Sequence, residues 1–246
     1  MMSTFLELPE APFFDAPAFA AEALSSWPSL AAVLDHTLLK PDATRDQVVQ
    51  LCHEAAQYHF ACAVTNPCWT SLASSVLSGT DVPVGVVVGF PLGASLTSTK
   101  RDEAEALIRL GARELDMVVN IGMVKAAEYD AVERDVRAVA QIAHEGGAAL
   151  KVILETCLLT TQEKLHTATL CLAAGVDFLK TSTGFSTGGA TVEDVRLLRG
   201  VAGGGAGVKA AGGIRTLADA RSMLEAGASR VGSSASVKII RELGAP

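Results

Sequence analysis

Two lysines in the sequence each end a short, mostly apolar run. Lys180 ends the run that begins at Val176, and Lys209 ends the run that begins at Gly207. An ammonium group is costly to remove from water, so a lysine at the end of a buried strand is unusual. If both side chains enter one small pocket, desolvation and like-charge repulsion lower the pKa of at least one of them. The neutral amine that results is the form that attacks a carbonyl carbon to make a Schiff base.

Asp116 is the acid that best complements these lysines. It lies two residues after Glu114, so the two side chains share one face of the same predicted strand. A carboxylate near two lysines can move protons while a carbinolamine forms and breaks down. A second interpretation stays open, in which Asp116 only balances lysine charge and the lysines extend outward or bind phosphate as point charges.

The elements that must position these residues alternate regularly. Eight short runs rich in apolar residues are predicted strands: 33–37, 61–65, 84–89, 114–119, 149–154, 176–180, 207–210 and 229–232. Eight amphipathic segments with a helical period separate or follow them: 44–59, 68–78, 98–110, 129–145, 162–174, 192–199, 217–226 and 234–243. Thr191 and Thr216 are N-capping residues in this pattern, and glycines such as Gly146 and Gly227 end helices.

Strict alternation of apolar strands with helices predicts parallel strands joined by right-handed crossovers. Eight such units predict an α/β fold of the (β/α)8 TIM barrel type over residues 31–246. The alternative is a doubly wound sheet, but the loop after the first strand, residues 38–41, lacks the glycines typical of that fold. Residues 1–30 lie outside the repeat and are predicted to form an N-terminal extension, either an arm or a short helix that covers the bottom of the barrel.

In a barrel of this type the active site lies at the carboxyl ends of the strands. Besides the residues above, this position selects polar side chains at or after several strands: Asp35, Thr37, Asn66, Asn120, Lys151, Glu155, Ser233 and Ser234. Gly212-Gly213 and residues 232–234 follow the last two strands, where this fold commonly binds a phosphate with backbone N–H groups. The glycine run 203–205 precedes a strand and is predicted to be a flexible connection.

Composition excludes several classes of function. The 246 residues include 27 Asp and Glu against 20 Lys and Arg, a net charge of -7, which leaves no basic face for nucleic acid or an anionic membrane. No apolar run approaches the ~20 residues of a membrane span, and the N-terminus does not resemble a signal peptide, which indicates a cytoplasmic protein. Five cysteines without a C-x-x-C pair, and histidines without metal-ligand spacing, predict neither disulfides nor a zinc site.

Six blocks of sequence resemble the deoxyribose-phosphate aldolase family, and they occur in the family's order from about residue 33 to 240. The blocks are LDHTLLKPDAT (34–44), GFPLG (89–93), ELDMVVNIG (114–122), LKVILET (150–156), FLKTSTGF (178–185) and VKAAGGIRT (208–216). The resemblance implies a class I aldolase, a carbon–carbon lyase that forms a Schiff base.

Matched position by position, the resemblance implies roles that agree with those expected from the barrel. Lys180 is the Schiff-base lysine, Lys209 lowers its pKa and relays protons, and Asp116 is the proton shuttle. Asp35, Thr37 and Lys151 are implied to line the substrate site. The residues implied to surround the phosphate are Thr183, Gly184, Gly212, Gly213, Ser233 and Ser234.

The sequence departs from the family pattern at three positions of interest. Cys157 stands where glycine often follows the LET triplet, which puts the loop after the fifth strand in doubt. Phe185 replaces a lysine that some relatives carry, and Ala235 replaces a second serine that many carry. Both changes remove a group that could bind the phosphate.

The implied reaction is the reversible cleavage of 2-deoxy-D-ribose 5-phosphate to D-glyceraldehyde 3-phosphate and acetaldehyde, without a metal or an organic cofactor. The expected partners are small phosphosugars and aldehydes, with a homodimer as an assembly the chain could form. Two alternatives stay open. One is a lysine-dependent aldolase or transaldolase for another phosphosugar, and the other is a barrel that binds sugar phosphates without catalysis.

Overall fold

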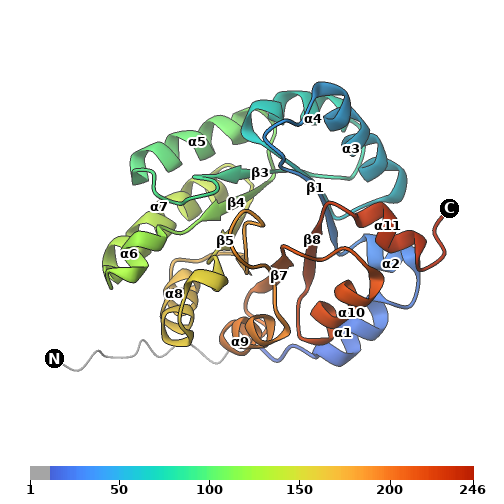
Figure 1. Ribbon diagram of the computed structural model, residues 1–246. Helices are drawn as coiled ribbons and strands as arrows, with labels where there is room; N and C mark the ends of the chain where they lie inside the picture. Colours follow the sequence, from blue (N-terminus) through green and yellow to red (C-terminus); the bar gives the residue numbers. More distant parts are fainter. Residues whose placement is uncertain (1–11) are drawn as a thin grey trace.

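The computed structural model describes residues 12–246, and these form a closed barrel of eight parallel strands in sequence order (Figure 1). The strands are β1 (Leu34–Leu38), β2 (Cys62–Thr65), β3 (Val84–Val88), β4 (Glu114–Val118), β5 (Ala149–Ile153), β6 (Phe178–Lys180), β7 (Gly207–Ala211) and β8 (Arg230–Ser233). β1 pairs with both β2 and β8, which closes the sheet. The predicted (β/α)8 fold is confirmed, with strand ends that differ from the prediction by one or two residues.

Eight helices lie around the barrel at the predicted places. They are α3 (Arg45–Tyr58), α4 (Thr70–Val76), α5 (Thr97–Arg109), α7 (Tyr129–Glu145), α8 (Thr161–Ala173), α9 (Val192–Ala202), α10 (Leu217–Glu225) and α11 (Ser236–Arg241). Side-chain caps fix several of their starts, because Thr44, Thr160 and Thr216 each accept a hydrogen bond from a backbone N–H three residues on. No helix within residues 12–246 has the length and apolar character of a membrane span.

Three short elements that the sequence patterns did not predict follow the carboxyl ends of strands. They are η1 (Pro67–Trp69), α6 (Ile121–Lys125) and η2 (Thr156–Leu158). Each is too short for a helical period to be recognisable in the sequence. They shape the loops at the mouth of the barrel.

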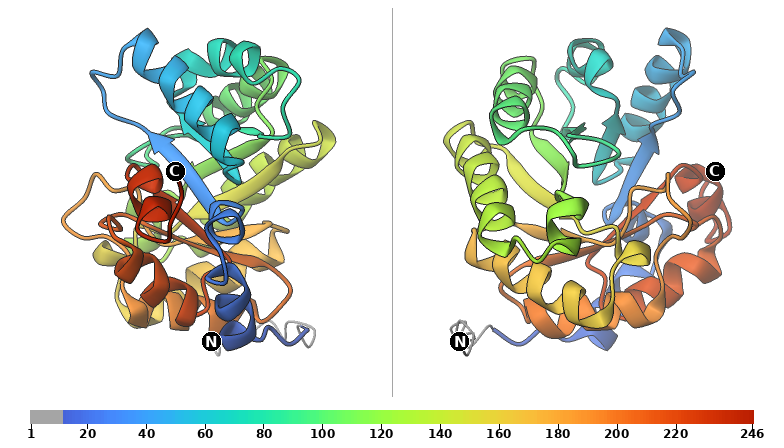
Figure 2. Two further views of the ribbon diagram at one scale, coloured as in Figure 1. Left: turned by 90° about the vertical axis from the view of Figure 1, so that its right-hand side faces the viewer. Right: turned by 60° about the vertical axis from the view of Figure 1, so that its left-hand side comes forward.

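The segment before the barrel forms two short helices. α1 (Ala16–Ala23) packs against α10, and α2 (Trp27–Ala31) packs against α11; in Figure 2 α1 lies at the bottom of the molecule and α2 above it. Each helix has a proline in its first turn, where the missing N–H costs nothing. Within the described residues the extension is therefore a helical pair rather than an arm, and α2 crosses the predicted boundary at residue 31. The prediction for residues 1–11 lies outside the described part of the chain.

The barrel interior has an apolar side and a charged side. A small cluster formed by Leu39, Cys62, Val64 and Val87, with Phe90 against it, fills the side near β2 and β3. The strand register brings charged residues together elsewhere, since Asp116 pairs with Lys151 and Lys180 pairs with Lys209 on neighbouring strands. Parallel pairing keeps such partners on the same face of the sheet. Charged side chains therefore face the interior from β4 to β8, and Asp35 on β1 joins them.

Candidate active site

A single carboxylate, that of Asp116, accepts hydrogen bonds from three lysines inside the barrel. Lys151 Nζ lies 2.8 Å from Oδ1, whereas Lys180 Nζ and Lys209 Nζ lie 2.7 and 2.6 Å from Oδ2. Asp116 is fully buried, and the three lysines are at most 3% exposed. The structure thus brings together the three residues predicted to be catalytic, with Lys151 beside them.

Burial and charge act in opposite directions on these groups. Burial raises the pKa of Asp116, but Lys151, Lys180 and Lys209 outweigh it and hold that pKa well below its usual range. Burial lowers the pKa of Lys180 to about 8; the charge of Asp116 opposes this change, and the charge of Lys209 adds to it. The expectation that one amine of the pair has a depressed pKa is met at Lys180, with desolvation as its first cause.

Asp35 and Lys151 do not line the cleft that contains Lys180 and Lys209. Both are fully buried. The Asp35 carboxylate lies 2.5 Å from Lys209 Nζ, and Lys151 Nζ lies 2.5 Å from the Glu114 carboxylate. The structure therefore gives both residues charged neighbours beside Lys180 and Lys209, and their direct contact with a substrate stays a prediction.

The cleft above Lys180 and Lys209 has a volume of about 240 Å³. It is lined by every other predicted substrate-binding residue: Thr37, Thr183, Gly184, Gly212, Gly213, Ser233 and Ser234. Gly232 makes room for the floor of the cleft, because a Cβ at this position would lie 3.1 Å from Lys209 Cε. A larger residue there would push the Lys209 side chain aside.

The loops after β6, β7 and β8 form the end of the cleft where a phosphate was predicted. Gly212 and Gly213 have φ angles of +89° and +84°, a backbone region that L-residues rarely adopt. The Ser233 hydroxyl donates to the Ile214 carbonyl at 2.7 Å and accepts from the Ala235 N–H at 2.9 Å, so it serves the loop itself. Ser234 is exposed and lines the cleft.

Two exposed cations also line the cleft, and neither was among the predicted site residues. Lys40 comes from the loop after β1, and Arg215 follows Gly212-Gly213 in the loop after β7. Arg215 could have been found from its position within two residues of the predicted anion loop. These side chains add positive charge to a cleft whose lining also includes Phe185, the position where some relatives carry a lysine.

Glu155 also lies beside the site, and no sequence pattern indicated which residue it contacts. It is 1% exposed and has a left-handed backbone, with a φ of 56°. Its carboxylate accepts hydrogen bonds from the N–H and the hydroxyl of Thr183. The Thr183 hydroxyl in turn accepts from the Phe185 N–H at 3.0 Å. Glu155 therefore holds the loop after β6 at the edge of the cleft.

Two of the three departures from the family pattern, Cys157 and Phe185, lie around this loop. Cys157 is exposed, and its Sγ lies 3.5 Å from the Ser186 hydroxyl. Phe185 is 49% exposed and packs edge-to-face on Phe90, with the ring centroids 5.3 Å apart. The side chain of Phe185 thus links the loops after β3 and β6 by an apolar contact.

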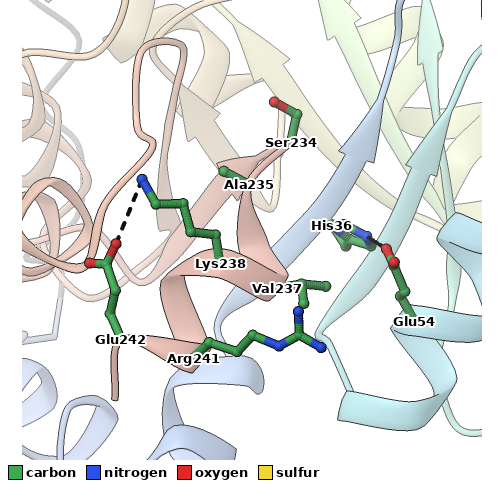
Figure 3. A pocket seen from close by; sticks show the side chains of 8 residues that line it. All are labelled: His36, Glu54, Ser234, Ala235, Val237, Lys238, Arg241 and Glu242. Carbon is green, nitrogen blue, oxygen red and sulfur yellow. Dashed lines mark hydrogen bonds and ion pairs between the residues drawn. The ribbon is translucent and has the colours of Figure 1, made fainter. Parts of the chain in front are cut away.

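A second pocket lies on the outside of the barrel, between α3 and α11 (Figure 3). Successive residues of β1 point to opposite faces, so His36 points outward while Asp35 and Thr37 point inward. His36 Nε2 lies 2.8 Å from the Glu54 carboxylate, and burial lowers the pKa of this histidine. His36 therefore connects β1 to α3, as expected for a histidine without metal-ligand spacing.

Three potential metal ligands, Asp35, Cys62 and Glu114, lie within 4.8 Å of one another in the described part of the chain. The two carboxylates already form ion pairs with buried lysines and with Arg230. Burial raises the pKa of the Cys62 thiol well above its usual value, which keeps it protonated. These groups therefore do not form a ready set of deprotonated ligands.

Comparison with known proteins agrees with this architecture. Residues 29–240 match the DeoC/LacD family aldolase. The deoxyribose-phosphate aldolase of Thermoanaerobacter sp. (strain X514) is 51% identical over 215 residues, covering 87% of this chain and 96% of that protein. The enzyme of the same name from Thermococcus gammatolerans is 54% identical over 213 residues, covering 86% of this chain and 95% of that protein.

The fold is shared with solved structures as well. A tetrameric deoxyribose phosphate aldolase from Aeropyrum pernix superposes with a TM-score of 0.86 at 36% identity, covering 93% of this chain and 96% of that one. The matched region includes every strand of the barrel and every residue of the Asp116 cluster. The chain belongs to the DeoC/LacD family of aldolases.

Proposed function

We propose that this protein is a class I aldolase, a carbon–carbon lyase that reversibly cleaves 2-deoxy-D-ribose 5-phosphate to D-glyceraldehyde 3-phosphate and acetaldehyde. One observation carries the proposal: Lys180 lines the cleft, its Nζ contacts the buried Asp116, and burial lowers its pKa to about 8. About a tenth of such an amine is neutral at pH 7, far more than for an ordinary lysine, and the neutral form is the one that attacks an aldehyde. The relatives named above carry the same activity in their names.

The chemical steps follow from the nucleophile. The neutral Lys180 amine adds to C1 of the open-chain sugar, and loss of water from the carbinolamine gives a protonated imine. The C3 hydroxyl loses its proton, the C2–C3 bond breaks, and its electron pair moves toward the imine to form an enamine. Glyceraldehyde 3-phosphate leaves; protonation of C2 and addition of water then release acetaldehyde and regenerate the amine.

Lys209 and Asp116 are the proposed proton relay. Lys209 lines the cleft beside Lys180, and both Nζ atoms contact Oδ2 of Asp116. A proton that passes between the two amines can therefore cross this one oxygen. A water in the cleft would complete the path to the C3 hydroxyl and later to C2 of the enamine.

The phosphate would bind at the opposite end of the cleft, remote from the bond that breaks. The backbone of Gly212 and Gly213, the Ser234 hydroxyl and the exposed cations Lys40 and Arg215 support this assignment. Binding energy from a remote group can hold the reacting carbon against Lys180. The excess negative charge of the chain lies elsewhere, which leaves the cleft locally positive for an anionic substrate.

Borohydride trapping tests the proposal. Reduction in the presence of acetaldehyde should add a two-carbon group to the Lys180 peptide, and deoxyribose 5-phosphate should give the same label. Labelling at another lysine would overturn the assignment of Lys180. Binding of the phosphosugar without any trapping would favour a non-catalytic barrel, and trapping with other phosphosugars but not this one would favour a different aldolase.

For the assembly we propose a homodimer. The support is a set of exposed apolar side chains after β3, Leu92 and Leu96, which are 71% and 74% exposed in the isolated chain. The Aeropyrum pernix relative is a tetramer, so the number of subunits is the quantity to measure. Light scattering coupled to gel filtration separates the dimer from a monomer or tetramer.

A further inference from the structure

A closed ring of charged side chains extends from the bottom of the barrel to Asp116. On one side of the ring, Arg230 Nη1 lies 2.6 Å from Asp35 Oδ1. Asp35 Oδ2 lies 2.5 Å from Lys209 Nζ, and that nitrogen lies 2.6 Å from Asp116 Oδ2. This side therefore ends on the oxygen that also contacts Lys180.

The other side of the ring starts from the same guanidinium nitrogen. Arg230 Nη1 lies 3.3 Å from Glu114 Oε2, and this oxygen lies 2.5 Å from Lys151 Nζ. Lys151 Nζ then lies 2.8 Å from Asp116 Oδ1. The two sides meet on the two oxygens of one carboxylate, so Arg230 and Asp116 are opposite corners of the ring.

Positive and negative groups alternate around the ring. Its cations are Arg230, Lys151 and Lys209, and its anions are Asp35, Glu114 and Asp116. The ring is neutral when all six groups are ionised. Lys180 is attached to Asp116 from outside the ring, so its ammonium is the one charge of the cluster that has no counterpart.

We propose that Arg230 and Glu114 are positioning residues that keep this ring neutral and thereby set the charge state of the Lys180 amine. The inference rests on the proposed role of Lys180 as the nucleophile. Neither residue lines the cleft. Both act through other side chains, Arg230 through Asp35 and Glu114 through Lys151.

The ring lies in largely buried surroundings, so its net charge acts strongly on the Lys180 ammonium. Its members are buried except for the side chains of Arg230 and Glu114, which are 16% and 12% exposed. The Phe178 ring lies 5.4 Å from the Arg230 guanidinium and shields it from solvent on one side. An unbalanced charge in such an environment interacts strongly with a nearby ammonium.

Titratable groups face this interior from β1, β2, β4, β5, β7 and β8, and β6 contributes Lys180 itself. They are Asp35, Cys62, Glu114, Asp116, Lys151, Lys209 and Arg230. Cys62 stays a neutral thiol because burial raises its pKa well above the usual value. Cys62 therefore adds no charge to the ring, and replacing one charged member by a neutral residue changes the net charge of the ring by one.

Two substitutions should move Lys180 in opposite directions. Arg230→Met leaves the ring with one excess negative charge, which favours the Lys180 ammonium and raises its pKa. Glu114→Gln leaves one excess positive charge, which disfavours the ammonium and lowers that pKa. The double variant restores neutrality and should return the pKa toward the wild-type value.

The experiment is the pH profile of kcat/KM for deoxyribose 5-phosphate cleavage, which reports ionisation of the free enzyme. We expect the rising limb to move to higher pH by about half to one unit in Arg230→Met, and to lower pH by a similar amount in Glu114→Gln. These shifts are smaller than the ~1–3 units that a directly contacting charge causes, because neither residue contacts Lys180. Arg230→Lys keeps the charge and is the matched control, with the limb unchanged.

A merely structural role predicts a different result, namely lower rates in both single variants with the limb in place or moved in the same direction. Either outcome would overturn the inference. If Arg230→Met does not fold, the comparison of Glu114→Gln with the wild type decides. The inference then requires that the rising limb of its pH profile moves to lower pH. Borohydride trapping at Lys180 in the wild type separates a failure of this inference from a failure of the proposed function. Absence of trapping refutes the proposed function. Trapping together with unmoved limbs in the variants refutes only the role of Arg230 and Glu114.

Discussion

Lys180 and Lys209 are paired in register on neighbouring strands, and their Nζ atoms contact the same oxygen of Asp116. Two ammonium groups converge on one carboxylate oxygen inside a buried cluster. The arrangement gives Lys180 a carboxylate that holds its position and a second amine that disfavours its proton. The first two predictions depend on this relationship.

Lys209→Leu is expected to leave the barrel folded and to reduce kcat/KM for deoxyribose 5-phosphate by on the order of 10²–10⁴, the range for loss of a proton-transfer group. The variant removes both the proposed relay amine and a charge that lowers the pKa of Lys180. Steady-state kinetics with circular dichroism as the folding control measure this. A near-normal rate in a folded variant would contradict a role for the Lys209 amine.

The depressed pKa of Lys180 has a consequence for stability. The folded state holds this proton less tightly than the unfolded chain, so between about pH 8 and 10.5 unfolding takes up a proton. The contribution of Lys180 to the free energy of unfolding should therefore rise with pH through that window. Lys180→Met should be more stable than the wild type at pH 7, by up to about 3 kcal/mol, and this difference should shrink by pH 10. Urea unfolding at both pH values tests it, and a constant difference would argue against a depressed pKa.

Glu155→Ala should raise KM for deoxyribose 5-phosphate while changing kcat much less. The substitution frees the Thr183 N–H and hydroxyl, whose hydrogen bonds to Glu155 hold the loop after β6, and a buried donor left unpaired costs about 1–3 kcal/mol. Unphosphorylated deoxyribose is the control substrate, because the loop lies at the proposed phosphate end. Equal losses with both sugars would indicate general damage to the site instead.

Arg215→Ala should weaken binding of the phosphorylated substrate by about 10- to 100-fold, as expected for loss of a charge-assisted contact. Arg215 lines the cleft, whereas Arg221 lies on α10 outside it with its side chain 48% exposed. Arg221→Ala is therefore the matched control for the loss of one positive charge. KM for the phosphosugar should rise with Arg215→Ala alone, and a similar rise in both variants would point to long-range electrostatics.

Lys40→Ala gives a further test of the phosphate end. Lys40 lines the cleft and comes from the loop after β1, whereas Phe185 comes from the loop after β6. If it supplies the positive charge that Phe185 lacks, KM for the phosphosugar should rise and KM for deoxyribose should stay the same. The Phe185→Lys variant should then compensate in part for the loss of Lys40. No change of KM in Lys40→Ala would remove this residue from the proposed phosphate site.

The sequence predicted the fold and the central residues because both depend on regular patterns. Apolar strands alternated with capped helices, and the barrel rule placed Lys180, Lys209 and Asp116 at one end of it. Arg230 escaped this reasoning because it begins β8, and the rule favours residues at the carboxyl end of a strand. Its connection to Asp35 depends on side-chain length across the barrel, which no sequence spacing reports.

Glu155 and Lys151 illustrate two other limits. Glu155 has a left-handed backbone that turns its carboxylate toward Thr183, and such a φ in a residue other than glycine leaves no pattern in the sequence. Lys151 was predicted to line the substrate site, which stays a prediction; its Nζ is buried between Glu114 and Asp116, a depth that the sequence did not indicate. Sequence alternation predicted that it points into the barrel, whereas its depth depends on the shear of the closed sheet.

The charged ring also limits which substitutions can make this barrel more stable to heat without loss of activity. Its six members occupy interior positions that apolar side chains fill in many barrels, and replacing buried ions with well-packed apolar residues is often neutral or stabilising. Selection for heat resistance alone would therefore favour joint replacement of paired members of the ring, because removing one partner leaves the other charge buried and uncompensated. The same substitutions would disturb the nucleophile, so the centre of the barrel is where thermal robustness and turnover compete most directly.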